Sequence, residues 1–255
     1  MAFTIAVAGK GGTGKTTLAA LIIFELLGRN LKPILAVDAD PNVNLNVLLG
    51  IDTPRAVGSL REETLKKIKN MDFPQGMSKS MYIEYRLQEC LAEREGIDLL
   101  VMGRPEGPGC YCFANDVLRK FIDTLTPNYH YVVIDSEAGM EHLSRRTTQN
   151  VDVLFIVSDE NPVSLRSAMR INNLVDELEL KISKRYLVLN NVNSDLSDRA
   201  KEEIKKSNLQ IGGVIPKDGG IFSLALEEKP LSQLSPESPA HAAVEKLLRT
   251  AGVIS

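Results

Sequence analysis

The stretch that most constrains the fold of this chain is a glycine-rich run near its start, residues 9–17, with the sequence GKGGTGKTT. It fits the pattern G-x-x-x-x-G-K-[ST], in which successive backbone N–H groups of a loop converge on phosphate oxygens. The apolar residues 3–8 before it predict a strand, and residues 18–27 after it have the apolar face of a helix. A glycine-rich turn outside this context would bind nothing, but strand, loop and helix together predict a nucleotide-binding α/β fold.

The residue types in this loop predict how it would hold a nucleotide. Lys15 would reach the β- and γ-phosphates, and the Thr16 hydroxyl would ligate Mg²⁺. The start of the following helix adds a positive potential of its own. The nucleotide-binding residues expected from the motif are Gly9, Gly11, Gly12, Thr13, Gly14, Lys15, Thr16 and Thr17.

The composition is that of an ordinary globular protein, and it excludes several classes of partner. The chain has 255 residues, of which 44% are hydrophobic and 25% charged, which suits one α/β domain over residues 1–255. A net charge of −3 does not indicate a nucleic-acid-binding face. No apolar run approaches the ~18 residues of a membrane span, and the early glycine-rich loop leaves no room for a secretory signal. We therefore expect a cytoplasmic protein with no nucleic-acid or membrane partner, in which three cysteines form no disulfide framework.

Acidic residues follow two of the predicted strands. Residues 34–37 run into Asp38-Ala39-Asp40-Pro41, and residues 131–134 run into Asp135. Open α/β sheets bind ligands outside the carboxyl ends of their strands. Asp135 is therefore expected on the Mg²⁺ side of the site. Asp40 belongs to the same edge, although it could instead cap the helix that follows.

A second informative stretch is Cys110-Tyr111-Cys112, which follows a Pro/Gly-dense segment and precedes a predicted helix. A helix N-terminus lowers the pKa of a thiol and favours the thiolate, which is the form that binds metal. Two thiolates alone seldom complete a soft-metal site. A two-fold dimer with these loops on its axis would supply four, whereas the alternative is a pair of incidental loop cysteines. The third cysteine, Cys90, is expected to be a small buried apolar residue.

Lys10, directly after the first glycine, gives the chain a resemblance to the deviant phosphate-loop ATPases, the family of the nitrogenase iron protein and the Min and Par ATPases. That resemblance implies a mostly parallel twisted sheet flanked by helices on both faces. It also implies that Lys10 reaches across a homodimer to the partner's nucleotide, where it offsets charge on the transferring phosphoryl group. The alternative for Lys10 is a solvated loop lysine.

The same resemblance assigns further residues. Asp40 would orient and activate the attacking water, and Asp38 would hold the hydration shell of Mg²⁺. Asn190 would read the adenine edge, because a primary amide both donates and accepts. Pro216 would lie where the family wraps the base. The expected catalytic residues are therefore Lys10, Lys15 and Asp40.

Taken together, the glycine-rich loop, the Asp-Ala-Asp-Pro segment, the Cys-Tyr-Cys and the stretch from Asp135 through Glu141-His142-Leu143 resemble the CooC/AcsF-type accessory ATPases. These mature carbon monoxide dehydrogenase and acetyl-CoA synthase by nickel insertion. The resemblance implies Ni²⁺ at Cys110 and Cys112 and such an enzyme as client. Four thiolates in a tetrahedron would favour Zn²⁺ or an Fe–S cluster instead, since Ni²⁺ prefers square-planar sites. We follow the family for Ni²⁺ and expect Zn²⁺ to compete.

Three other functions are compatible with parts of the sequence. A nonhydrolysing metal carrier would use nucleotide only as a structural ligand, but the presence of both Lys10 and Asp40 argues for hydrolysis of MgATP. An Fe–S reductase like the nitrogenase iron protein needs another cysteine in its second switch, and residues 136–146 contain none. His142 in that segment is expected to pack or form a salt link. A Par-type DNA-segregation ATPase is disfavoured by the net negative charge and the cysteine pair.

Overall fold

A computed structural model describes residues 2–52, 55–60, 63, 67, 70, 74–103, 120–136, 150–192, 196–206 and 209–255. The strands are β1 Phe3–Gly9, β2 Ile34–Asp38, β3 Leu91–Arg94, β4 Ile97–Val101, β5 Tyr131–Asp135, β6 Asn150–Ser158, β7 Lys181–Val192 and β8 Ile211–Pro216. The α-helices are α1 Lys15–Gly28, α2 Leu45–Leu49, α4 Lys79–Gln88, α7 Pro162–Glu177, α8 Asp198–Lys206, α9 Gly219–Leu226 and α10 Pro239–Ala251. There are also two short 3₁₀ turns, η1 Thr126–Asn128 and η2 Leu231–Gln233.

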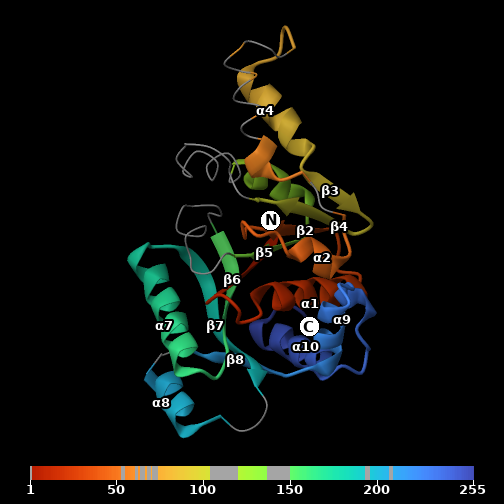
Figure 1. Ribbon diagram of the computed structural model, residues 1–255. Coiled ribbons are helices and arrows are strands. Elements are labelled where there is room, and N and C mark those ends of the chain that lie inside the picture. Colours follow the sequence, from red (N-terminus) through yellow and green to blue (C-terminus); the bar gives the residue numbers. More distant parts are fainter. Residues whose placement is uncertain are drawn as a thin grey trace.

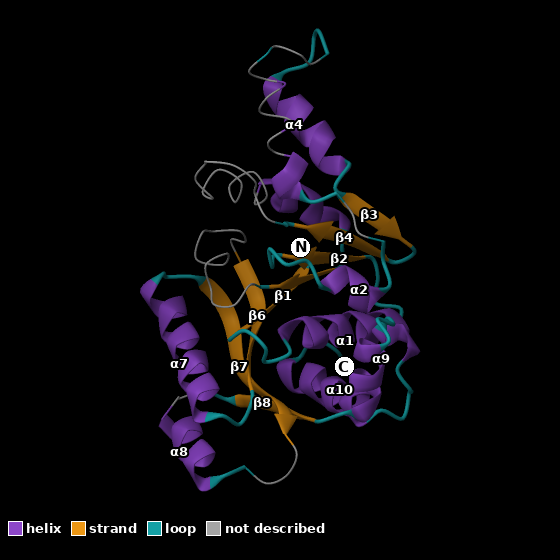
Figure 2. Ribbon diagram, in the orientation of Figure 1, coloured by secondary structure: helices purple, strands orange, loops and turns teal. Residues whose placement is uncertain are grey.

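The strands form one 8-stranded sheet in the order β3-β4-β2-β5-β1-β6-β7-β8. Every neighbouring pair from β4 to β8 is parallel, and only β3 runs antiparallel to its neighbour β4. The helices lie on both faces of this twisted sheet (Figure 1, Figure 2). The expected α/β fold with a mostly parallel sheet is therefore confirmed.

Each central strand is buried on both faces because its alternate side chains enter two different apolar layers. Ile5 and Val7 of β1 belong to the layer beneath α1, α2 and α10, whereas Ala6 and Ala8 belong to the layer beneath α4, α7 and α8. Near-continuous apolar runs are what a parallel sheet covered on both faces requires. This is why the short runs before each polar strand end were recognisable as strands.

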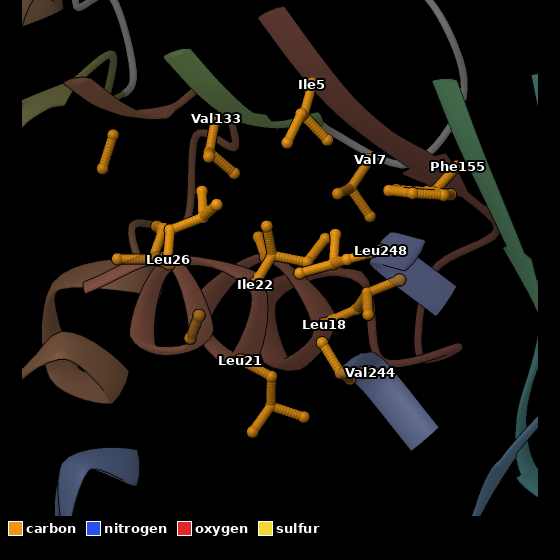
Figure 3. Packing of buried hydrophobic residues seen from close by; sticks show 14 of the residues in the cluster. Ile5, Val7, Leu18, Leu21, Ile22, Leu26, Val133, Phe155, Val244 and Leu248 are labelled. Atoms are coloured by element: carbon orange, nitrogen blue, oxygen red, sulfur yellow. The ribbon is translucent and has the colours of Figure 1, made fainter. Parts of the chain in front are cut away.

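Helix α1 is buried over most of its circumference, since it lies between the sheet and α10. Figure 3 shows this layer, in which side chains of the sheet meet those of α1 and α10: Ile5, Val7, Val133, Phe155, Leu18, Ile22, Leu26, Val244 and Leu248. Full burial of one such side chain contributes about 1.5–3 kcal/mol. The packing therefore holds the first turn of α1, which carries Lys15 and Thr16, in a fixed position on the sheet.

The segment after Tyr82 differs from what its sequence predicts. Apolar residues recur at helical spacing at Tyr82, Tyr85, Leu87 and Leu91, which predicts a helix from Tyr82 to Arg94. This prediction is wrong at its end, because α4 ends at Gln88 and residues 91–94 form β3. Leu91 pairs with Leu100 in an antiparallel hairpin that turns at Gly96, where φ is 81°. A four-residue strand carries too few residues for its period to differ from that of a helix. Pairing with β4 decided the outcome.

No helix within the described parts of the chain is both long and apolar enough to cross a membrane.

Candidate nucleotide-binding site

The residues of the glycine-rich loop lie between the end of β1 and the start of α1, at the edge where the parallel strands end. Gly14 is the N-cap of α1 and has a φ of 88°, in the left-handed region that favours glycine. A Cβ on Gly14 would lie 2.2 Å from Asn190 Nδ2, so no side chain fits there. A Cβ on Gly9 would lie 2.4 Å from the Val157 carbonyl oxygen. The loop thus follows a path on which these two positions must be glycine.

The loop is tied together at the Lys10 carbonyl. This oxygen accepts a hydrogen bond from Thr13 Oγ1 at 2.8 Å and another from Lys15 Nζ at 3.4 Å. Thr13 and Lys15 are both buried, with 1% and 6% of their surfaces exposed, whereas the Lys10 side chain is exposed. The ammonium group of Lys15 is therefore folded back over the loop, and that of Lys10 faces outward.

Two aspartates meet beside this loop, because β2 and β5 are neighbours. Asp38 and Asp135 are Cα partners in the parallel register, so their side chains point to the same face of the sheet. Asp38 is fully buried; its Oδ1 accepts from the Asp40 N–H, and its Oδ2 accepts from the N–H groups of Asn44 and Leu45, each at 3.0 Å. Burial raises the pKa of Asp38 above its ordinary value, although these hydrogen bonds favour the charged form.

Asp135 has a different environment. It is 1% exposed, and neither carboxylate oxygen makes a well-formed hydrogen bond with the described residues. Burial raises the pKa of Asp135 to about 7; the neighbouring Thr16 hydroxyl and Lys15 ammonium lower it, and the Asp38 charge raises it. A buried polar group without partners is costly. A hard cation that takes oxygen ligands would satisfy it, so the donor set of Asp135 and Thr16 fits Mg²⁺.

Asp40 lies half-buried in the turn after β2, where its Oδ1 accepts from the Asn42 N–H at 2.8 Å. The sequence left open whether Asp40 caps the following helix. In the structure, Asp38 rather than Asp40 receives the first N–H groups of α2. Asp40 therefore shapes its own turn and stays beside the loop, at the edge where a phosphate would lie.

A cavity of about 390 Å³ opens next to the loop, between α1, the ends of β7 and β8, and α9. This volume lies in the range of small-molecule sites. Its lining includes Thr17 and the two residues expected to contact a base, Asn190 and Pro216. Sequence reasoning missed other lining residues: Asn191, Lys217, Asp218 and Phe222.

Two of these residues, Asn191 and Phe222, have features that mark them as part of a ligand site. Asn191 is the second amide of an Asn-Asn pair at a strand end, and its φ of 58° accompanies an irregular register between β7 and β8. Both consecutive amides consequently line the cavity. Phe222 belongs to α9, an apolar helix without a buried residue, and is 62% exposed. An apolar helix exposed beside a cavity indicates a ligand or partner surface.

The expected metal-binding loop, with Cys110 and Cys112, and most of the second switch, with His142, lie outside the described residues. Within the described ranges, no group of three or more His, Cys, Asp or Glu side chains could hold a metal ion. Cys90 is fully buried, and burial raises the pKa of its thiol to about 12. Cys90 is thus a core residue, as its sequence context predicted.

The chain is similar in sequence to known nucleotide-binding proteins over most of its length. The family of the CobQ/CobB/MinD/ParA nucleotide binding domain matches residues 4–231. An uncharacterised ATP-binding protein of Methanocaldococcus jannaschii is 43% identical, over 95% of this chain and 96% of that protein. The carbon monoxide dehydrogenase accessory protein CooC of Rhodospirillum rubrum is 30% identical, over 97% of each chain.

Solved structures support the fold. The cell division ATPase MinD of Pyrococcus furiosus aligns over 100% of both chains with a TM-score of 0.70 and 22% identity. MinD of Pyrococcus horikoshii, solved as a complex with Mg-ADP, aligns over 97% of this chain and 94% of that chain, with a TM-score of 0.67 and 23% identity. By its sequence, its loop and its sheet, the chain belongs to the CobQ/CobB/MinD/ParA family of nucleotide-binding proteins.

Proposed function

We propose that this protein hydrolyses ATP to ADP and phosphate in a Mg²⁺-dependent reaction. The observation that carries the proposal is the group formed by Thr16, the folded-back Lys15 and the buried Asp135 carboxylate, whose oxygens make no well-formed hydrogen bond within the described residues. This arrangement is costly without a ligand and is satisfied by a cation and phosphate oxygens. The ATP-binding relative at 43% identity supports the same ligand.

The residues would divide the chemistry as follows. Thr16 and Asp135 would hold Mg²⁺, which when bound neutralises charge on the phosphates. Lys15 would bind the β- and γ-phosphate oxygens. Asp38 already accepts three backbone hydrogen bonds, so of about four acceptor positions only one remains for water around the cation. Asp40, at the open edge, would orient the attacking water and take its proton.

Phosphate release with MgATP tests this proposal. Lys15→Ala should abolish nucleotide-dependent activity, because the phosphates lose their buried cation. Asp40→Ala should bind ATP but not turn it over. Asp52→Ala, an exposed aspartate away from the loop, serves as the matched control and should keep wild-type turnover. If Asp40→Ala hydrolysed ATP at the wild-type rate, Asp40 would not be the general base that activates the attacking water.

We further propose that the ATPase is a dimeric switch that binds a metal ion, Ni²⁺ in the cell with Zn²⁺ able to substitute, at Cys110 and Cys112 of both chains. Its client would be an enzyme of the carbon monoxide dehydrogenase/acetyl-CoA synthase class. Support comes from the Cys-Tyr-Cys sequence and from the similarity to CooC over nearly the whole chain. Thiolate pairs from two chains would complete a four-ligand site, and ATP and metal would each favour the associated state.

Anaerobic titration with Ni²⁺ or Zn²⁺, with and without MgATP, tests the shared site. One ion per dimer is expected, with proton release and weaker affinity at lower pH as the thiols must ionise. Cys110→Ser and Cys112→Ser should each lose tight binding but still bind ATP, while the core variant Cys90→Ser should keep tight binding. One ion per monomer, or unchanged affinity in Cys112→Ser, would contradict the shared site.

A further inference from the structure

The side chain of Asn190 joins the cavity to the glycine-rich loop. Its Nδ2 lies 2.8 Å from the Thr13 carbonyl oxygen, and only 7% of the residue is exposed. Because a peptide carbonyl can only accept, the nitrogen end of the amide must face Thr13. The contact joins residues 177 positions apart in the sequence, so it exists only in the folded chain.

The loop side of this contact is closely fitted. Gly14, the next residue after Thr13, lies so near Asn190 that a Cβ there would be 2.2 Å from Nδ2. Thr13 is itself held by the Lys10 carbonyl, through its hydroxyl at 2.8 Å. The amide of Asn190 therefore braces one side of a short turn that also orients Lys15 through the same Lys10 carbonyl.

The strand side of the contact is rigid. Leu189, the residue before Asn190, pairs with Ser158 of β6 and with Val214 of β8, and its side chain is fully buried. A side chain carried on a strand paired on both edges is positioned more firmly than one on a loop. The end of β7 therefore supports the glycine-rich loop through this contact.

We infer that Asn190 is a positioning residue for the phosphates as well as a wall of the base cavity, so that one amide couples the two halves of the nucleotide site. A primary amide has two N–H donors and one carbonyl acceptor. One donor goes to Thr13, which leaves the other donor and the carbonyl for a base. This inference rests on the proposed nucleotide function and adds to the base-reading role that the sequence predicted.

Ligands with and without a base separate the two roles. We would measure the affinities of MgADP and of Mg-pyrophosphate, which has two phosphates but no base, by calorimetry. In Asn190→Ala the affinity for pyrophosphate should fall about three- to tenfold, the effect of one lost hydrogen bond. The affinity for ADP should fall by more. In the control Phe222→Ala, which lines the cavity away from the loop, ADP should bind more weakly and pyrophosphate within about twofold of wild type.

The outcomes are distinct. If Asn190→Ala weakens ADP alone and leaves pyrophosphate within about twofold of wild type, Asn190 only lines the cavity and the inference is wrong. If the wild-type protein binds neither ligand, the proposed function itself fails. Asn190→Leu removes the amide at similar volume and should give the same pattern, with thermal unfolding confirming that each variant is folded. In wild-type protein labelled with ¹⁵N-asparagine, pyrophosphate should shift the side-chain amide signal of Asn190, and an unshifted signal would contradict the coupling.

Discussion

The burial of the Asp135 carboxylate makes the stability of the folded protein depend on pH. The group lies under the loop with both oxygens unpartnered within the described residues, and burial raises its pKa to about 7. In the unfolded chain the pKa of the same carboxyl is near its ordinary value of 3.8. Between these two values the folded protein binds a proton that the unfolded chain has released. The free energy of unfolding must therefore fall as the pH rises through this window.

Asp135→Asn should remove this pH dependence, since an amide of the same shape does not ionise. Without nucleotide and Mg²⁺, the free energy of unfolding of wild type should fall between pH 5 and pH 8, whereas that of the variant lacks this contribution. The difference, variant minus wild type, should therefore be about 2–3 kcal/mol larger at pH 8 than at pH 5. Chemical denaturation at both pH values measures this difference. Added MgATP should stabilise wild type at pH 8 but not the variant, because the cation loses its carboxylate. If the difference in unfolding free energy between the variant and wild type did not change with pH, the pKa of Asp135 would not be raised in the folded protein.

Helix α9, which lines the cavity, shares a cap with helix α10. Asp218 follows β8 and is the N-cap of α9: its Oδ1 accepts from the N–H groups of Gly220 at 2.7 Å and Ile221 at 3.4 Å. Its Oδ2 accepts from the Ser238 hydroxyl and from the Ala240 N–H at the start of α10. Burial raises the pKa of Asp218, but these hydrogen bonds together hold it below its ordinary value. One carboxylate therefore fixes the start of α9, which lines the cavity, and the start of α10.

Asp218→Ala should lower the free energy of unfolding at pH 7 by about 1–2 kcal/mol, as expected for the loss of an N-cap. Because the folded pKa is lowered, this contribution is complete above the unfolded pKa and disappears as the pH falls through the folded pKa. Denaturation curves at pH 7 and pH 3 check the sign. Asp198→Ala is the control, since Asp198 lies in the first turn of α8 with a fully exposed side chain, and it should change stability far less. Equal losses in the two variants would contradict a special role for Asp218.

The arrangement of the whole chain leaves Lys10 unused by its own site. Its carbonyl oxygen organises the loop, but its side chain is exposed. As the family resemblance implies, we expect this exposed lysine to reach the nucleotide of a second copy across a two-fold axis. A symmetric dimer would then contain two composite sites, each with Asp40 from one chain and Lys10 from the other.

Mixing two inactive variants tests this arrangement. Lys10→Ala should reduce hydrolysis by ~10³–10⁵, by analogy with an arginine finger. Asp40→Ala should be inactive for a different reason. In a mixture, each heterodimer retains one intact composite site, so the rate should recover to about a quarter of wild type if the chains mix randomly. If the mixture hydrolysed ATP no faster than either variant alone, Lys10 would act in its own chain's site or would have no role in hydrolysis.

Local sequence was sufficient for the features that depend on neighbouring residues. The glycine-rich loop between an apolar strand and a helix, and the aspartates at the ends of β2 and β5, were predictable because each depends on a short window of chain. The mostly parallel sheet was expected from the family resemblance, and the structure confirms it. The roles of Lys10, Cys110 and Cys112 stay predictions.

The tertiary structure decided which of these windows became neighbours. The strand order places β2 beside β5, which brings Asp38 and Asp135 into register. Asp38 accepts backbone hydrogen bonds, whereas the oxygens of Asp135 make no well-formed hydrogen bond in the part of the chain that the structure describes. The strand order also brings Asn190 onto Thr13 and pairs residues 91–94 with β4 instead of continuing α4. No local pattern encodes these contacts, since they depend on how the whole sheet buries its two faces. A buried group's pKa and hydrogen bonds depend on its spatial neighbours, and those neighbours exist only after the chain has folded.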